Sequence, residues 1–259
     1  MPGGFSSLNP DPPFVVEDGH KRSLHFSYGE IQSGMRTDRP DQLQVDYTRT
    51  MMGFLLLQPR PATIGMVGLG GGSLAKFCHR HLAPARILVA ENNPGVLALR
   101  RRFLIPDDDE RLSVALADGA AWVRLQRGCL DVLLVDGFDR SGQPEALCSQ
   151  AFYDDCWQAL APCGVLVVNL HTDHDAHPAF CARLLRSFGG NAMQVVTRDH
   201  SNCLVFAARG RDVTLQALRS TGWADALAPE AQRQLRGEFA HIGWNAAAVR
   251  TAVDGLSGG

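Results

Sequence analysis

The feature that most constrains this chain is a series of short aliphatic segments, each followed by a helical pattern, that begins at Thr63. The candidate strands are Thr63–Val67, Arg86–Glu91, Leu112–Leu116, Asp131–Asp136 and Val165–Leu170. They are almost purely aliphatic, as is typical of strands buried on both faces. The candidate helices are Ser73–Arg80, Pro94–Phe103, Ala120–Gln126 and Gln150–Leu160. This alternation predicts a parallel, doubly wound α/β sheet.

The end of the chain predicts smaller additions to this sheet. A helical pattern at Pro178–Ser187 leads to two further strand patterns, Met193–Thr197 and Cys203–Ala208, with a short polar turn between them. We expect these two strands to close the sheet as an antiparallel pair. The tail from Val213 predicts one or two short helices.

The start of the chain predicts a small β region. Residues 1–21 are rich in Gly, Pro, Ser and Asp, which predicts a loose lead-in. Apolar and polar residues then roughly alternate in Arg22–Ser27 and Glu30–Met35, on either side of Tyr28-Gly29. This pattern predicts a small β-hairpin.

A helical pattern links this region to the sheet. The apolar spacing within Asp41–Leu57 favours a helix that is stopped by Pro59 and Pro61. We therefore expect a lead-in, hairpin and linking helix in residues 1–58, and a Rossmann-like catalytic domain in residues 59–259.

Composition excludes several classes of protein. The net charge is −2, which makes nucleic acid a poor partner. No apolar run approaches the roughly 18 residues of a membrane span, and Met1–Val16 lacks the pattern of a secretory signal. The seven cysteines are scattered without a C-x-x-C pair, which predicts buried thiols in a reducing compartment. We therefore expect a cytoplasmic protein.

Ligands of doubly wound sheets bind at the carboxyl ends of the strands, and glycines follow the first strand here. Gly68, Gly70 and Gly72 belong to the stretch Gly68-Leu69-Gly70-Gly71-Gly72-Ser73, which precedes a helix. Glycines let the backbone turn sharply and approach a ligand closely, although a tight β–α turn alone would also need them. This position favours a nucleotide-type ligand.

Acidic residues follow the next two strands. Glu91 lies about 20 residues after the glycine loop, where a carboxylate accepts hydrogen bonds from the two ribose hydroxyls of a nucleoside. The alternative is a surface glutamate. Asp118-Gly119 follows the third strand, and Asp118 either accepts from an adenine amino group or only caps the following helix.

Two further acids flank the loop after the fourth strand. Asp136 and Asp139 are explained either by ordinary turn chemistry or by a carboxylate pair that faces the ligand. In the second interpretation one acid takes a proton from an amine and the other holds a cation.

Together, Glu91, Asp118, Asp136 and Asp139 would form an acidic mouth. Such a mouth repels a pyrophosphate and attracts a sulfonium or an ammonium group. Ser73 also stands where the dinucleotide fingerprint prefers Gly or Ala. The sequence therefore favours S-adenosylmethionine chemistry over NAD chemistry.

With these residues in place, the chain resembles the spermidine synthase (polyamine aminopropyltransferase) family from about Ile31 to Ala208. The motifs that carry the resemblance are Gly68-Leu69-Gly70-Gly71-Gly72, Glu91, Asp118-Gly119, Asp136-x-x-Asp139, Leu147-Cys148-Ser149, Phe152-Tyr153 and Leu160-Ala161-Pro162-Cys163-Gly164-Val165. Upstream, Ile31-Gln32 and Tyr47 fall where that family has a ligand-contacting Gln and Tyr.

The resemblance implies a methyltransferase-like Rossmann fold and transfer of an aminopropyl group from decarboxylated S-adenosylmethionine to a small-molecule amine. It implies that Asp136 receives or orients the proton of the amine, and that Asp139 anchors the cationic end of the substrate. Glu91 would hold the ribose and Asp118 the adenine, with Gln32, Gly68, Gly70, Gly72 and Gly119 also on the donor. Tyr47 would line the substrate groove. By resemblance we also expect a homodimer.

Two departures from the family pattern leave the substrates open. The family has an Asp at Gly71 that contacts the amine of the donor and disfavours a donor carboxylate, so intact S-adenosylmethionine is electrostatically permitted here. A family His-Glu is replaced by Thr48-Arg49. An S-adenosylmethionine-dependent methyltransferase and a non-catalytic adenosyl-ligand-binding homologue are therefore the alternatives.

A metal is not expected. His171, His174 and His177 are spaced by three residues, which would suit a metal only if this stretch were helical. The chain is leaving a strand there, so a hydrophilic loop at the rim of the site is the interpretation that we adopt.

Overall fold

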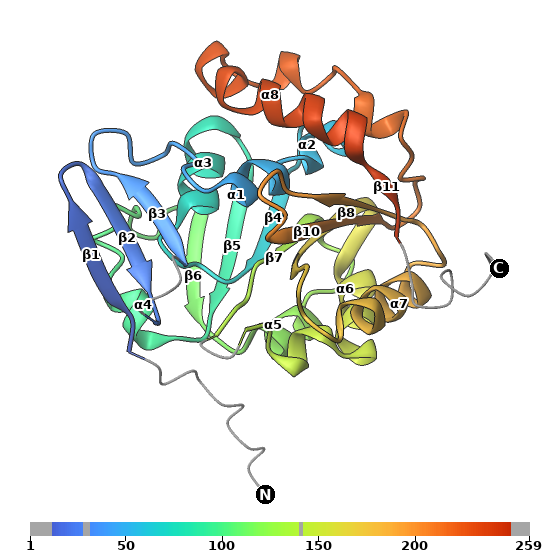
Figure 1. Cartoon of the computed structure of the whole chain (residues 1–259), viewed down its shortest axis with the longest axis horizontal. Coiled ribbons are helices and arrows are strands. Elements are labelled where there is room, and N and C mark those ends of the chain that lie inside the picture. Colours follow the sequence, from blue (N-terminus) through green and yellow to red (C-terminus); the bar gives the residue numbers. More distant parts are fainter. Residues whose placement is uncertain (1–11, 28–31, 140–141, 250–259) are drawn as a thin grey trace, which may run out of the picture.

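A computed structural model describes residues 12–27, 32–139 and 142–249, and its core is an eight-stranded sheet (Figure 1). The strand order is β11-β9-β10-β8-β7-β4-β5-β6. The parallel strands are β4 (Thr63–Val67), β5 (Arg86–Glu91), β6 (Leu112–Leu116), β7 (Leu130–Val135) and β8 (Leu160–His171). The antiparallel strands are β9 (Ala192–Val196), β10 (Asn202–Ala208) and β11 (Ala247–Ala248).

This order confirms the doubly wound sheet and its antiparallel closing pair. The chain adds β5 and β6 on one side of β4, and then β7 and β8 on the other. The winding therefore reverses between β4 and β7, which is where such sheets bind ligands. Strand β8 begins earlier than the predicted Val165, because a shift in register lets Leu160 pair with Leu130 before Val165 pairs with Val132.

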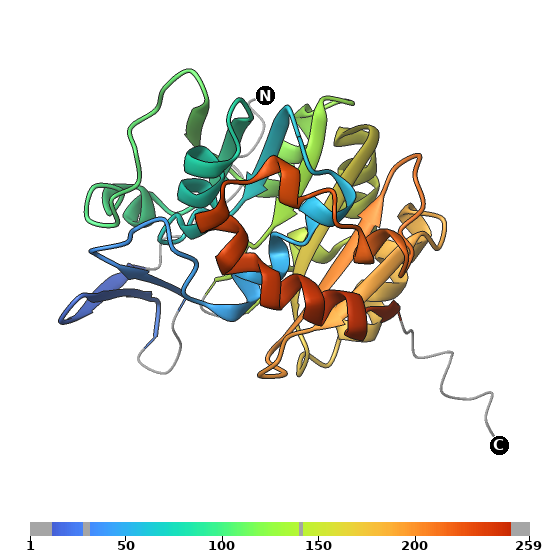
Figure 2. The same ribbon diagram turned by 90° about the horizontal axis from the view of Figure 1, so that it is seen from above.

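Helices cover both faces of the middle of the sheet, which explains the aliphatic strands there. Strand β6 is the exception: it lies at the edge of the sheet and is largely exposed, so the prediction that it is buried on both faces was wrong. In β7, Val132 and Leu134 belong to one hydrophobic cluster, whereas Leu133 and Val135 belong to the other. The helices around the sheet are α3 (Ser73–His81), α4 (Pro94–Ala98), α5 (Gly119–Leu125), α6 (Gln150–Ala159) and α7 (His177–Ser187). Helices α5, α6 and α7 pack side by side along one face (Figures 1 and 2). All seven cysteines are free thiols, and five of them are buried.

Three predictions about helices were wrong. Helix α4 ends at Ala98 rather than at Phe103, and tight turns follow it. The predicted helix over Asp41–Leu57 is two helices, α1 (Asp46–Met51) and α2 (Phe54–Leu57). Its first residues are not helical: Val45 is the extended N-cap of α1, with φ of −89° and ψ of 133°, and the backbone N–H of Leu43 donates to Gln234 Oε1 at 3.1 Å. The third concerns the tail.

The tail is longer and more ordered than predicted. Two short 3₁₀ turns, Ala217–Arg219 and Ala224–Ala226, lead to α8 (Pro229–Asn245), a helix of 17 residues. In the view from above α8 lies across α1 (Figure 2). Its buried residues recur at helical spacing and join the core. The buried carboxylate of Glu238 accepts from Thr50 Oγ1 at 2.7 Å and lies 3.3 Å from Arg198 Nε. Among the described residues, none of the tail lines the site described below.

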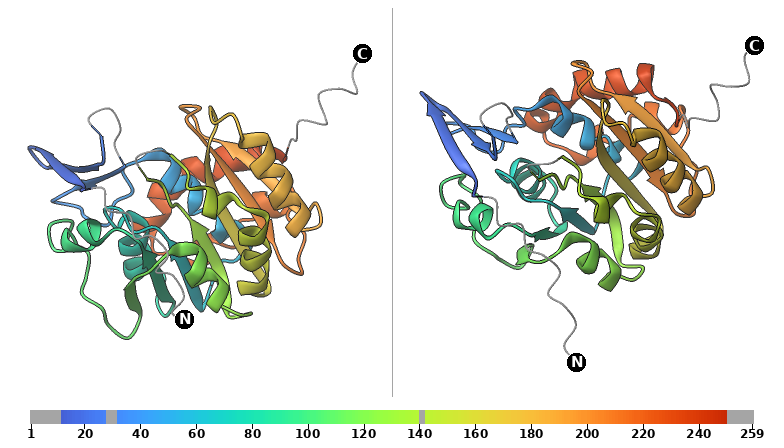
Figure 3. Two further views of the ribbon diagram at one scale, coloured as in Figure 1. Left: turned by 90° about the horizontal axis from the view of Figure 1, so that it is seen from below. Right: turned by 60° about the horizontal axis from the view of Figure 1, so that its bottom comes forward.

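A separate three-stranded antiparallel sheet stands to one side of the large sheet (Figures 1 and 3). Its strands are β1 (Phe14–Asp18), β2 (Lys21–His25) and β3 (Ser33–Arg36). The predicted hairpin is confirmed as β2 and β3, although Tyr28-Gly29 and residues 30–31 lie outside the described residues. The lead-in over residues 1–21 was wrong for Phe14–Asp18, whose Phe-Val-Val run pairs with β2.

Lys76 on α3 connects the small sheet with the turns that follow α4. It is 4% exposed, donates to the carbonyl oxygen of Phe103 at 2.8 Å and lies 3.0 Å from the sulfur of Met35 on β3. Burial lowers the pKa of Lys76 to about 7.

The boundary between residues 58 and 59 stays a prediction. Helices α1 and α2, which precede it, pack on β8 and β10.

The buried amine of Lys76 predicts a pH-dependent stability. Between pH 7 and 10.5 the unfolded lysine binds a proton that the folded one releases, so the free energy of unfolding rises with pH, by up to about 1.4 kcal/mol per pH unit. Lys76→Met should flatten this rise. Denaturant unfolding at pH 7 to 9.5 measures it, with Lys21→Met, at an exposed position, as the control. Identical slopes in the wild type and Lys76→Met would refute the assignment.

Candidate functional site

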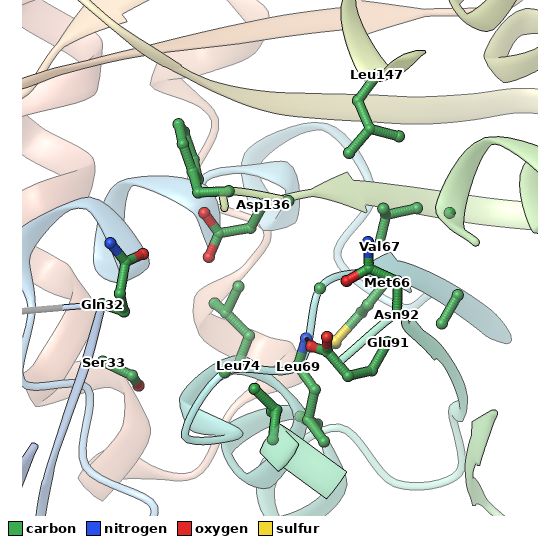
Figure 4. Close-up of a pocket in the computed structure, with 18 of the residues that line it drawn as sticks. Gln32, Ser33, Met66, Val67, Leu69, Leu74, Glu91, Asn92, Asp136 and Leu147 are labelled. Atoms are coloured by element: carbon green, nitrogen blue, oxygen red, sulfur yellow. Dashed lines mark hydrogen bonds between the residues drawn. The ribbon is translucent and has the colours of Figure 1, made fainter. Parts of the chain in front are cut away.

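A hollow lies at the carboxyl ends of β4, β5 and β7, under the small sheet (Figure 4). Its walls come from the glycine loop, from the loops after β5, β6 and β7, from α1, and from the β2–β3 hairpin. The predicted site residues among its lining are Gln32, Tyr47, Gly68, Gly70, Glu91, Asp118, Gly119 and Asp136. The fold thus brings together residues that lie far apart in the sequence.

Gly68 is required where the ends of β4 and β7 meet. Its φ is +95°, and a Cβ at this position would lie 2.3 Å from the carbonyl oxygen of Asp136. Any side chain would therefore push the two strand ends apart. Gly68 donates its N–H to the carbonyl oxygen of Ala90 at 2.9 Å, which also ties the loop to β5.

The carboxylate of Glu91 is held by backbone N–H groups and is 7% exposed. Its Oε2 accepts from Leu69 at 2.9 Å and its Oε1 from Asn93 at 2.8 Å. Burial raises the pKa of Glu91, and these backbone hydrogen bonds oppose that rise. The backbone N–H groups of Gly70 and Asn92 also bear on this carboxylate, so a ligand hydroxyl would share its oxygens with them.

Asp136 points into the hollow (Figure 4). Each of its carboxylate oxygens accepts a hydrogen bond. The hydroxyl of Tyr47 donates to Oδ2 at 3.0 Å, and the amide of Asn169 donates to Oδ1 at 2.9 Å. Burial raises the pKa of Asp136, while the two donors and the charge of His171 oppose the rise. A carboxylate with a raised pKa is a better proton acceptor than an ordinary aspartate.

Asp118 caps helix α5 and also lines the hollow. Its Oδ1 accepts from the backbone N–H of Ala121 at 2.8 Å, which is the capping geometry that the sequence offered as one interpretation. The two interpretations are compatible, because a carboxylate has further lone pairs.

Two predicted residues do not line the hollow. Gly72 is the N-cap of α3, with φ of +69°, and a Cβ there would lie 2.5 Å from Ile105. Asp139 lies in a turn in which its backbone exchanges hydrogen bonds with that of Gly142. The predicted cation-anchoring role of Asp139 stays a prediction.

Charge is the main chemical property of this hollow. The carboxylates of Glu91, Asp118 and Asp136 line it, and among its described lining residues there is no Lys, Arg or His. Such a site favours a cation and disfavours a pyrophosphate. Arg49 does not line this hollow. It pairs instead with Asp46 and donates to the carbonyl oxygen of Leu43 at 2.6 Å. Thr48 does line the acidic hollow.

A second hollow shares a wall with the first. Gln32, Tyr47 and Phe138 line both. The second is also lined by the end of β8 and the residues after it (His171, Thr172 and Asp173) and by the β9–β10 turn (Asp199, His200 and Ser201). We call it the outer hollow. In the described ranges, no three His, Cys, Asp or Glu side chains converge as metal ligands would.

The sequence reasoning missed Asn169 and Ser33. Asn169 is a polar residue within the aliphatic run of β8, which was a usable signal because buried polar groups need partners. Ser33 is buried and lines the hollow, and its Oγ lies 3.4 Å from the Oγ of Ser73. No local sequence pattern indicates a role for it.

Gly71 is enforced by packing. A Cβ at this position would lie 2.7 Å from Ser33 Oγ and 2.9 Å from the ring of Phe103. We therefore expect Gly71→Ala to lower the free energy of unfolding by about 1–3 kcal/mol, as overpacking does. Denaturant unfolding checks this. Combining Gly71→Ala with Ser33→Gly should recover part of the loss; an unperturbed single variant would contradict the packing argument.

The described part of the chain has no helix with the length and hydrophobicity to cross a membrane.

No protein-family model matches the sequence. The chain is 38% identical over 226 residues to the polyamine aminopropyltransferase of Chromobacterium violaceum, covering 87% of this chain and 84% of the relative. It is 36% identical over 195 residues to the polyamine aminopropyltransferase of Neisseria meningitidis serogroup A, covering 74% of each chain.

Solved structures agree on the fold. A probable spermidine synthase from Corynebacterium glutamicum superposes with a TM-score of 0.68 at 18% identity, covering 87% of this chain and 84% of that one. Human methyltransferase-like protein 13 in complex with SAH superposes with a TM-score of 0.63 at 25% identity, covering 74% of this chain and 93% of that one. The fold is thus that of methyltransferase-like Rossmann proteins, with a small N-terminal antiparallel sheet.

Proposed function

Because the chain belongs to the polyamine aminopropyltransferase family, we propose that it transfers an aminopropyl group from decarboxylated S-adenosylmethionine to a small-molecule amine. The observation that carries this proposal is the acidic hollow, in which three carboxylates meet without a described cationic side chain. Its charge suits a donor that carries both a sulfonium and an ammonium group.

Glu91 and Asp118 are the proposed donor-binding acids. The carboxylate of Glu91, which backbone N–H groups hold in place, accepts hydrogen bonds from the ribose hydroxyls. Asp118 accepts from the adenine amino group with its remaining capacity. Gly68, Gly70 and Gly119 let the backbone approach the ligand, and Gln32 covers it from the small sheet.

Asp136 is the proposed proton acceptor. The amine nitrogen attacks the carbon next to the sulfonium, so that a C–N bond forms, the C–S bond breaks and the pair of electrons returns to sulfur. Neutral methylthioadenosine leaves, and the proton of the amine passes to Asp136. Since the leaving group is neutral, positioning and deprotonation carry most of the catalysis. Tyr47 holds the carboxylate beside the groove.

Two alternatives have support of their own. Gly71 removes the acid that would disfavour a donor carboxylate, and the similar human methyltransferase-like protein 13 holds SAH, which favours an S-adenosylmethionine-dependent methyltransferase. A non-catalytic adenosyl-ligand-binding protein would fit the same departures. The amine acceptor is open, and the cytoplasmic location and the homodimer stay predictions.

One assay separates these functions. The protein is incubated with putrescine and either decarboxylated or intact S-adenosylmethionine, and the products are resolved by chromatography and mass spectrometry. Methylthioadenosine and an aminopropylated amine from the decarboxylated donor support the proposal. SAH from the intact donor with a methylated product supports the methyltransferase. Donor binding without product from a panel of amines supports the non-catalytic alternative and contradicts ours.

A further inference from the structure

Two buried asparagines connect Asp136, at the end of β7, to the neighbouring strands β8 and β10. Asn169 on β8 is 1% exposed, and its amide nitrogen donates to Asp136 Oδ1 at 2.9 Å. Its Oδ1 accepts from the amide nitrogen of Asn202 on β10 at 2.9 Å. Asn202 is 8% exposed. Asp136, Asn169 and Asn202 therefore form one hydrogen-bonded chain, which we call the amide relay.

The direction of the relay is set by the charge at one end. An ionised carboxylate only accepts hydrogen bonds, so Asn169 must present its nitrogen to Asp136 and its oxygen to Asn202. Asn202 must then present its own nitrogen. If Asp136 were protonated, this constraint would be lost. The relay in its observed direction therefore favours the charged form of Asp136.

The fold holds the relay rigidly. Strands β8 and β10 are antiparallel, and Asn202 pairs with His171 while Leu204 pairs with Asn169, so the two asparagines are diagonal neighbours. The carbonyl oxygen of Asn169 accepts from Gln143 Nε2 at 3.0 Å. Buried amides are costly unless they are hydrogen-bonded, and an aliphatic pair would fill this sheet without that cost. Their placement therefore calls for a role beyond stability.

We propose that Asn169 and Asn202 are positioning residues for Asp136, an inference that rests on the proposed function of Asp136 as proton acceptor. Asn169 fixes one carboxylate oxygen, so that the other, held by Tyr47, faces the groove. Asn202 acts through Asn169 by keeping its amide in the donating direction. Both asparagines also line the outer hollow, on the side away from the glycine loop.

The relay has a measurable effect on pH dependence. The groups that bear on the charge of Asp136 are Tyr47 from α1, His171 and Asn169 from β8, and the surrounding apolar burial. Burial raises the pKa of Asp136 and the donors oppose it, so loss of the relay raises that pKa further. Asp136 then stays protonated to higher pH, and the acidic limb of the plot of kcat against pH moves to higher pH.

The test uses Asn169→Leu and Asn202→Leu, which remove the amides but keep a similar volume. The control is Asn191→Leu, because Asn191 hydrogen-bonds backbone groups near the other end of β10. Two readouts are needed: the titration of the Asp136 carboxyl carbon by NMR in the ligand-free protein, assigned with Asp136→Asn, and kcat against pH. The NMR readout does not depend on turnover, so it separates failure of the relay from failure of the proposed function.

We expect both relay variants to titrate Asp136 at higher pH and to lose about tenfold or more in kcat on the acidic side, with recovery as the pH rises. The double variant should lose no more than Asn169→Leu alone, because Asn202 acts only through Asn169. An unchanged titration, a loss that is equal at every pH as in the control, or additive losses would overturn the proposal. If Asn169→Leu fails to fold, Asn202→Leu alone decides.

Discussion

Replacing Asp136 with Asn should abolish amine transfer, with a fall in kcat of about a thousandfold or more, because an amide cannot take the proton of the amine. The donor affinity should stay within a few-fold, since Glu91 and Asp118 hold the donor in our account. Burial raises the pKa of the Asp136 carboxyl group, so its charged form does not stabilise the fold. Removing that charge should therefore not lower the free energy of unfolding at pH 8.

This prediction is checked by turnover and by calorimetric titration of the donor with the same preparation. The matched control is Asp175→Asn, which changes an exposed acid of the loop after β8 that lines neither hollow. Its rate should equal that of the wild type. Wild-type turnover by Asp136→Asn would refute the role of Asp136; a joint loss of turnover and donor binding would instead assign it to the donor.

Glu91→Ala should chiefly weaken binding of the adenosyl ligand, by about a hundredfold, because it removes the acceptor for two hydroxyls. The truncation also leaves the N–H groups of Leu69 and Asn93 without their acceptor, so the free energy of unfolding should fall by about 1–3 kcal/mol. Methylthioadenosine is the best probe, since it keeps the ribose but lacks the charge of the donor.

Calorimetry with methylthioadenosine and an unfolding curve test both parts of this prediction. Glu91→Gln separates the effect of volume from the effect of hydrogen bonding. Glutamine keeps the volume of the side chain but replaces one acceptor oxygen with an NH2 donor. The matched control is Glu110→Ala, at an exposed position away from the hollow. If Glu91→Ala bound methylthioadenosine as tightly as the wild type, Glu91 would be a structural residue of the glycine loop and nothing more.

The sheet and its acidic edge could be predicted because both follow from local patterns. Strands buried on both faces must be aliphatic throughout, and parallel strands bring their carboxyl ends to one edge. The sequence alone therefore predicts that Glu91, Asp118 and Asp136 meet at one edge, and all three line the same hollow. The same argument could not place Asp139, because the course of a loop beyond a strand end depends on contacts distant in the sequence.

What escaped prediction was decided by tertiary contacts. Strand β1 pairs with β2, and the residues before α1 are extended at Val45, where Leu43 bonds to Gln234 on α8. The partners of Asp136 come from α1 and β8, on either side of it in the chain. The position of Asn169 within an aliphatic strand was visible in the sequence, but its partner on β10 was not.

The most direct test of the account is a calorimetric comparison of three ligands on the wild-type protein: decarboxylated S-adenosylmethionine, neutral methylthioadenosine and NAD. A hollow lined by three carboxylates should bind the cationic donor more tightly than methylthioadenosine at pH 8, and should not bind the pyrophosphate of NAD. Tighter binding of NAD than of either adenosyl compound would contradict the account.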